Sequence, residues 1–281
     1  MTSHANAPEL FDHAALRGRL ARAERLGAEP FLLDAVSGDL AERLGAVLRD
    51  FNHAIDLGTP LAGLRDVLAK RAGRVDLVDL FASDDEDLQL APQSIDLAVS
   101  ALALQFANDL PGVFAQVRRG LKPDGLFLAA MIGGDTLIEL RQAFAAAESE
   151  RDGGISPRVA PVIDVRDLGA LLQRAGFALP VTDSDRLTVR YDNAFALMRD
   201  LRRMGATNVL VERRRVPLRR ATLLRVAEIY AERFSDPDGR IRATFDILWL
   251  SGWAPHDSQQ KPLRPGSAQT SLADAVKNAR R

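Results

Sequence analysis

The chain has 281 residues, of which 47% are hydrophobic and 27% charged, and its formal net charge is -1. Such a chain can bury a sizeable core, and its near-neutral charge gives no general reason to expect binding to nucleic acid. The absence of cysteine excludes disulfides, thiolate metal sites and cysteine nucleophiles, and the four scattered histidines predict no metal site. With no membrane-length apolar stretch and no signal-peptide pattern, the chain is expected to be cytoplasmic.

Residues 1–50 are predicted to form N-terminal helices, because Leu40, Leu44 and Leu48 recur at helical spacing and Ser37 is suited to cap their helix. A core of alternating strands and helices is expected over 51–191 and 241–256. This alternation predicts an α/β fold with a doubly wound, mostly parallel sheet covered by helices on both faces. The predicted strands are 53–58, 74–80, 94–104, 126–132, 185–191 and 243–253.

Residues 192–240, between the last two predicted strands, are helical in pattern and rich in arginine, so we expect an inserted helical lobe. Arginine runs of this kind are usually solvated helix faces, and the alternative is docking of an acidic protein or an anionic membrane surface. Aromatic residues are not interleaved, which argues against single-stranded nucleic acid. Residues 257–281 are expected to form a polar C-terminal tail that ends in a short helix.

Several stretches resemble one known family. The order of IDLG, an acidic loop and IDLAVSALALQFANDLPGVFAQVRRGLKPDGLFLAAMI resembles the class I S-adenosylmethionine-dependent methyltransferases, which have a Rossmann-like fold. GGDTLIELR, AESERDGGISPRVAPV and GWAPHDSQQKPLRPGSA look like one branch, the methyltransferase-like assembly factors of respiratory complex I, of the arginine-modifying type. The resemblance runs from Leu10 to Ala268 and implies a seven-stranded sheet whose last strand is antiparallel.

The resemblance also implies a site for S-adenosylmethionine. Folds of this kind bind their ligands at the carboxyl ends of the strands, and an acid of the family approaches the adenine there. The candidate cofactor-binding residues at these strand ends are Asp56, Gly58, Asp84, Asp85 and Ser100.

The turn after the first strand departs from the family pattern Asp-Leu-Gly-x-Gly-x-Gly. Asp56 and Gly58 match, but Pro60 and Ala62 replace the later glycines, and proline offers neither an N–H nor a positive φ. Thr59 and Pro60 also suit an ordinary helix start, with threonine as the N-cap and proline at the first helical position. The cofactor site is therefore predicted to be degenerate.

The interval after the first strand is also short. Only 40 residues separate Asp56 from Asp96, whereas a single βαβ unit takes roughly 30 or more. One strand-helix unit is therefore predicted to be shortened, and the ribose-binding acid that closes the second strand in the family is expected to have no counterpart. Asp79 is the alternative candidate, and it can equally be a solvated acid at a strand end.

The stretch after the fourth predicted strand supplies further candidates. The family motif includes Asp135 and Arg141, which are the candidate catalytic residues, and Asp135 is also suited to cap a helix starting at Thr136. Glu139 is explained equally well by a surface charge pair. Gln105 stands where relatives of this branch tend to have a histidine, so an imidazole that could act as a general base is lost.

Three functions are compatible with these features. The first is an S-adenosylmethionine-dependent methyltransferase, or a related side-chain-modifying enzyme, that acts on a protein subunit during complex I (NADH:ubiquinone oxidoreductase) assembly. The second is a non-catalytic assembly chaperone with a degenerate cofactor site. The third is a small-molecule or carrier-protein methyltransferase, a group without the GGDTLIELR signature. In the first two cases, the sequence is also compatible with a peripheral contact between the protein and the inner membrane.

Overall fold

The computed structural model describes residues 9–83 and 85–260 of the chain. Its centre is a six-stranded sheet with the strand order β2-β1-β3-β4-β6-β5. Neighbouring strands are parallel except where β6 is involved, because β6 runs antiparallel to both β4 and β5. The predicted mostly parallel α/β sheet with an antiparallel last strand is thus confirmed. The strands are β1 (Phe51–Leu57), β2 (Ala72–Val78), β3 (Ile95–Ala101), β4 (Leu121–Gly133), β5 (Ala178–Tyr191) and β6 (Ile241–Trp253).

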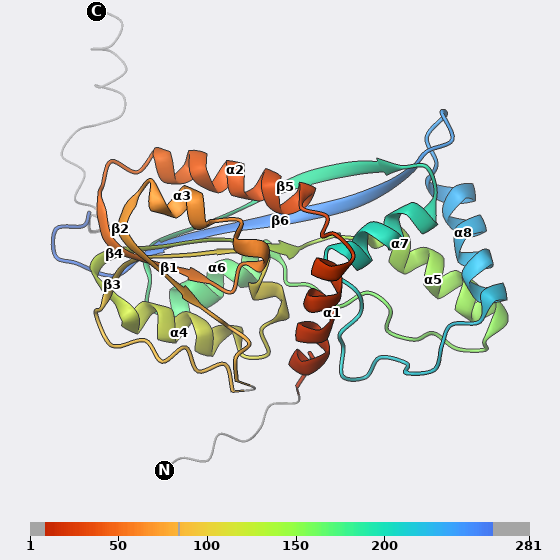
Figure 1. Cartoon of the computed structure of the whole chain (residues 1–281), viewed down its shortest axis with the longest axis horizontal. Helices are drawn as coiled ribbons and strands as arrows, with labels where there is room; N and C mark the ends of the chain where they lie inside the picture. Colours follow the sequence, from red (N-terminus) through yellow and green to blue (C-terminus); the bar gives the residue numbers. More distant parts are fainter. Residues whose placement is uncertain (1–8, 84, 261–281) are drawn as a thin grey trace, which may run out of the picture.

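Helices lie on both sides of the sheet (Figure 1). Each side has its own apolar cluster, as expected when both faces of a sheet are buried. The first cluster includes side chains of α2 (Phe31–Gly45), α3 (Arg65–Ala69), α5 (Ile138–Arg151), α7 (Ala194–Arg203) and α8 (Arg220–Phe234). The second includes side chains of α1 (His13–Arg25), α4 (Leu110–Gly120) and α6 (Val165–Arg174).

The sheet edge next to β1 shows where the predicted shortening falls. β2 pairs in parallel with β1, with Leu77 beside Asp56, and β2 is the outermost strand on that side. The described residues therefore form six strands instead of the seven that the resemblance implied, and the shortened unit lies beyond β2. Asp79 directly follows β2. This position favours Asp79 as the counterpart of the acid that closes the second strand in the family, an acid that was expected to have no counterpart.

The second N-terminal helix starts earlier than predicted. α2 begins at Phe31, after Pro30, so Ser37 lies buried inside the helix and does not cap it. A proline is tolerated at a helix start because the first N–H groups have no partner within the helix. The helix ends at Gly45, and Leu48 beyond it is fully exposed, so the prediction that Leu48 belongs to the buried face was wrong.

Residues 192–240 contain α7 and α8, joined by a long loop, and connect β5 to β6 (Figure 1). α8 packs beside α5, and α7 packs beside α1. The loop that follows α7 reaches the carboxyl ends of the parallel strands. Of the predicted tail, the residues from 261 onward lie outside the described part of the chain, and with them the predicted final helix.

Candidate functional site

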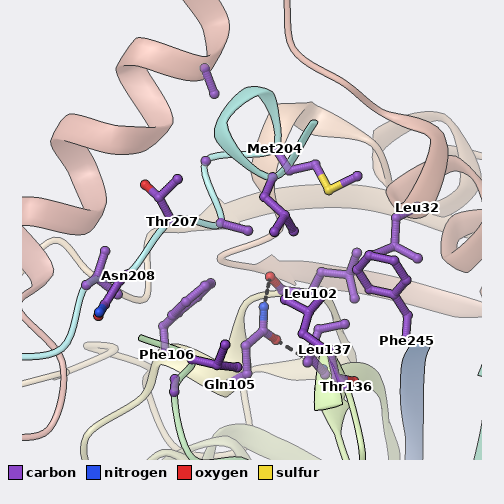
Figure 2. Close-up of a pocket in the computed structure, with 18 of the residues that line it drawn as sticks. Leu32, Leu102, Gln105, Phe106, Thr136, Leu137, Met204, Thr207, Asn208 and Phe245 are labelled. Atoms are coloured by element: carbon purple, nitrogen blue, oxygen red, sulfur yellow. Dashed lines mark hydrogen bonds between the residues drawn. The ribbon is translucent and has the colours of Figure 1, made fainter. Parts of the chain in front are cut away.

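A cavity of about 440 Å³ lies at the carboxyl ends of β1, β3 and β4. Its other walls come from α1, the start of α2, α7 and the loop after α7. In Figure 2, Leu102, Gln105 and Phe106 enter it after β3, Leu137 enters after β4, and Met204 enters from the lobe. Because α/β folds of this kind bind ligands at the carboxyl ends of their strands, this cavity is the candidate functional site.

Most of the cavity wall is aliphatic or aromatic, and the two polar side chains at the strand ends, Gln105 and Thr136, are bonded within the chain. Gln105 donates a hydrogen bond from Nε2 to the Leu102 carbonyl at 2.6 Å. Thr136 donates from Oγ1 to the Gly133 carbonyl at 2.8 Å. These two groups therefore offer a ligand little hydrogen-bonding capacity that is not already used.

The turn after β1 requires a glycine at position 58, both for its backbone conformation and for its packing. Gly58 has a φ of +70°, and a Cβ at this position would lie only 2.9 Å from the Cβ of Leu80. Thr59 does not cap a helix, because its hydroxyl accepts a hydrogen bond from the Ala101 amide at 3.0 Å and the chain continues as a short 3-10 segment, Pro60–Ala62. The regular helix of this interval, α3, therefore begins at Arg65 and not at Thr59 as the sequence pattern suggested.

Asp56, at the end of β1, is only 2% exposed and is not part of the cavity wall. Neither of its carboxylate oxygens has a hydrogen-bond partner with good geometry in the described chain. Burial raises the pKa of Asp56, and the nearby hydroxyl and amide of Thr59 and the charge of Arg65 offset only part of that effect. A buried acid without a partner favours its neutral form, and such a group calls for a structural or functional explanation.

The remaining predicted cofactor residues are not gathered around the cavity. Ser100 is fully buried and donates its hydroxyl to the Leu57 carbonyl at 2.7 Å, which ties β3 to β1. Asp85 is exposed on the loop after β2, and Asp84 lies outside the described residues. Of the predicted cofactor residues that the structure describes, none contributes to the cavity wall.

α1 covers the loop that follows β2. Nε2 of His13 lies 3.3 Å from Oε1 of Glu86, with both side chains 2% exposed. Arg17 donates to the Phe81 carbonyl at 2.6 Å, and the rings of His13 and Phe81 lie 4.9 Å apart. Glu86 also accepts a hydrogen bond from the Asn108 amide at 2.6 Å, which links this cover to the segment after β3.

These contacts bear on whether S-adenosylmethionine fits. A nucleoside cofactor of this fold class needs open space beside the glycine turn and an acid free to bind its ribose. Here Leu80 and Ala103 fill the space beside Gly58. Asp79 is exposed at the end of β2, and only its Oδ1 accepts a hydrogen bond, from the Phe81 amide at 2.9 Å, so the misfit lies at the turn and not at this acid. With α1 lying over the same loop, the residues as arranged do not fit the adenosine half of the cofactor.

The predicted catalytic residue Asp135 points away from the cavity. Its exposed carboxylate lies 2.8 Å from Nη2 of Arg186, and Nε of the same arginine donates to the buried Asp246 at 2.7 Å. Burial alone would raise the pKa of Asp246, but hydrogen bonds from Arg186 and from the Asp135 amide, with the Arg186 charge, lower it overall. Asp135 is not a helix cap, because α5 begins after Leu137, whose φ is +55°.

Arg141, the other predicted catalytic residue, supports the cavity wall from behind. Its Nη2 donates to the carbonyl of Ala160, a residue of the wall, at 3.1 Å. Glu139 is buried and accepts hydrogen bonds from the amide and the hydroxyl of Thr244 at 3.1 and 2.5 Å. The interpretation of Glu139 as part of a surface charge pair was therefore wrong, because the carboxylate joins α5 to β6.

The arginine-rich lobe divides into paired and unpaired arginines. Arg213 bonds to Asp12 at 2.8 Å and Arg214 to Asp152 at 3.3 Å, so both hold the lobe to the rest of the chain. Arg215 is exposed and forms no ion pair with another described residue. Across residues 9–83 and 85–260, no helix is long and apolar enough to cross a membrane.

Sequence reasoning missed two features of the site. His13 was one of four scattered histidines and Glu86 one acid of an acidic loop, and their distance along the chain gives no local signal that they meet. The second feature is the backbone of the leucines in the cavity wall. Leucine is a good helix former, and the left-handed region is unfavourable for any residue with a Cβ. Nothing in the sequence therefore signals the left-handed conformation of Leu137.

Comparisons with known proteins give a consistent result. A family model described as a methyltransferase domain matches residues 45–129. The mitochondrial arginine-hydroxylase NDUFAF5 of Danio rerio is 39% identical over 265 residues, which cover 88% of this chain and 82% of that protein. The malonyl-[acyl-carrier protein] O-methyltransferase of Xylella fastidiosa is 40% identical over 176 residues, which cover 63% of this chain and 57% of that protein.

Among solved structures, a Bacillus halodurans protein described as a methyltransferase matches with a TM-score of 0.51 and 14% sequence identity. The match covers 78% of this chain and 98% of that one. At this identity the similarity shows the fold alone.

Proposed function

Because this chain belongs to the arginine-hydroxylase NDUFAF5 family, within the class I methyltransferase fold, we propose that it acts on a protein subunit during assembly of respiratory complex I. One observation carries this proposal: the match to an arginine-hydroxylase extends over 88% of the chain. The motif GGDTLIELR, on which the resemblance to complex I assembly factors rests, lies within the same match. An arginine side chain of the subunit is the proposed point of action.

Two forms of this function differ in chemistry. In the catalytic form, Asp135 and Arg141 serve the modification, Arg141 by holding Ala160 in the cavity wall. In the other form, the chain is an assembly chaperone that binds the subunit without modifying it. The cover of α1 over the loop after β2 and the unpaired carboxylate of Asp56 favour the second form, with S-adenosylmethionine bound weakly at most.

A carrier-protein methyltransferase is the third candidate. The similarity to malonyl-[acyl-carrier protein] O-methyltransferases reaches 40% identity, but it covers only 57% of that relative. A match over the methyltransferase domain alone is what two families sharing that domain would show. We therefore place this function below the first two.

The proposed location follows from the proposed partner. The arginine-hydroxylase relative is mitochondrial by name. For this chain we propose the cytoplasm, with peripheral contact at the inner membrane through the exposed arginines of residues 192–240.

Deletion of the gene tests the proposal. Assembled complex I and NADH-dependent respiration should fall, while succinate-dependent respiration should be spared. Complementation with Asp56→Asn, Asp135→Ala and Arg141→Ala then separates the two forms, because a chaperone should tolerate all three changes if the protein folds. Normal complex I in the deletion strain would refute the proposed function.

A further inference from the structure

Three leucines of the cavity wall have a backbone conformation that leucine rarely adopts. The φ angles of Leu61, Leu102 and Leu137 are +60°, +53° and +55°. Each follows the carboxyl end of a parallel strand, namely β1, β3 and β4 in that order. The left-handed region is unfavourable for any residue with a Cβ, and glycine or asparagine would relieve it. In each of them an unfavourable backbone conformation therefore accompanies a side chain that forms part of the cavity wall.

Strained conformations tend to gather at functional sites, where the surrounding structure holds them in place. In the described chain, eight non-glycine residues have a positive φ, and three of them meet at this one cavity. A fourth leucine with positive φ, Leu179 (+49°), lies away from the cavity on β5 and is exposed. The convergence of the other three gives the cavity an apolar wall at the very ends of the strands.

The two arginines at the cavity are paired with acids of the same chain. Arg203 pairs with Glu29 at 3.0 Å, and Arg158 bonds to the fully buried Glu148. Glu24, the other acid of the wall, is exposed to solvent. The described cavity therefore presents no buried, unpaired charge to a ligand, and a charged group moved into it would lose its hydration without compensation.

We propose that this cavity is a binding site for an uncharged, largely apolar small molecule, with Leu61, Leu102 and Leu137 as its walls. The volume of about 440 Å³ is within the range of small-molecule sites, roughly 300–1,000 Å³. An ionised ligand such as S-adenosylmethionine does not match this lining, and neither does the arginine side chain of the catalytic form, so the proposal goes with the chaperone form of the proposed function. The site goes beyond the proposed function, since a chaperone that binds the subunit does not require a small-molecule ligand.

Fluorescence titration of the full chain with diphenylhexatriene, a neutral apolar probe, tests the site. The matched variants are Leu61→Asn with Leu102→Asn, in which asparagine tolerates the left-handed backbone but makes the wall polar. Leu179→Asn is the control, because it makes the same change away from the cavity. We expect saturable binding by the unmodified chain and the control, and binding at least about tenfold weaker in the double variant.

Three results would overturn the proposal. They are an absence of saturable binding, equal affinity in all three proteins, and displacement of the probe by S-adenosylmethionine. Thermal unfolding of each variant verifies that it is folded before titration. A negative result in the titration would not bear on the proposed role in complex I assembly, because the deletion and complementation experiment measures that function separately.

Discussion

Nε2 of His13 lies 3.3 Å from Oε1 of Glu86, and the pair is buried where α1 crosses the loop after β2. His13→Ala should lower the free energy of unfolding by about 1–3 kcal/mol, because the buried Glu86 loses a polar partner. Hydrogen exchange should become faster in α1 first. His53→Ala is the control: its pair with Asp76 is partly exposed, so a loss of about 0–1 kcal/mol is expected. Equal losses in the two variants would contradict a special role of the buried pair.

The unpaired carboxyl of Asp56 predicts an unusual dependence of stability on pH. Because burial raises its pKa, its contribution to stability is complete below the ordinary value of 3.8 and is lost as the pH rises through the elevated pKa. Asp56→Asn removes the charge but keeps the shape, so at neutral pH it should be more stable than the unmodified chain, and the difference should shrink as the pH falls. Urea unfolding at several pH values measures this, and a less stable variant at neutral pH would show that Asp56 has a partner.

Asp246 should show the opposite dependence. Its pKa is lowered overall by Arg186 and the Asp135 amide despite burial, so its contribution is present above 3.8 and is lost as the pH falls through the lowered pKa. Asp246→Ala should cost about 1–3 kcal/mol at neutral pH, since the Asp135 amide loses its acceptor. Asp135→Ala, which removes only an exposed partner of Arg186, should cost about 0–1 kcal/mol. The comparison is made by denaturant unfolding, and the reverse order would contradict this account.

The paired and unpaired arginines of the lobe allow an effect on partner binding to be distinguished from an effect on folding. Arg215→Glu should weaken co-purification of the partner with little change in the thermal midpoint, because Arg215 forms no ion pair within the described chain. Arg213→Glu should lower the midpoint instead, since it sets a new carboxylate against Asp12. Affinity capture together with thermal unfolding distinguishes the two. Unchanged capture with Arg215→Glu would assign this arginine to a solvated surface.

Calorimetry with S-adenosylmethionine tests the fit of the cofactor. No dissociation constant in the low micromolar range, about -8 kcal/mol, is expected for the unmodified chain. Pro60→Gly alone should not create binding, because Leu80 still fills the space beside Gly58 and α1 still covers the next loop. Tight binding by either protein would show that α1 moves aside, and it would favour the catalytic form of the proposed function.

The sequence by itself determined the elements and the type of sheet. Short apolar runs separated by turn residues predict buried strands wherever they occur, and their alternation with helices leaves a parallel sheet as the main solution. The match to the GGDTLIELR motif likewise needs no tertiary information. Even the shortened unit could be inferred, from the 40 residues between Asp56 and Asp96, because the length of chain limits what it can build.

Only the tertiary structure decided which side chains meet. Asp135 and Arg141 follow a strand end as predicted, but one faces Arg186 and the other Ala160, since packing of distant strands sets their direction. The pairing of His13 with Glu86 brings together segments far apart in the chain, and neither segment encodes it locally. The left-handed leucines are decided in the same way: local preference opposes this conformation, and it persists because the surrounding packing outweighs it.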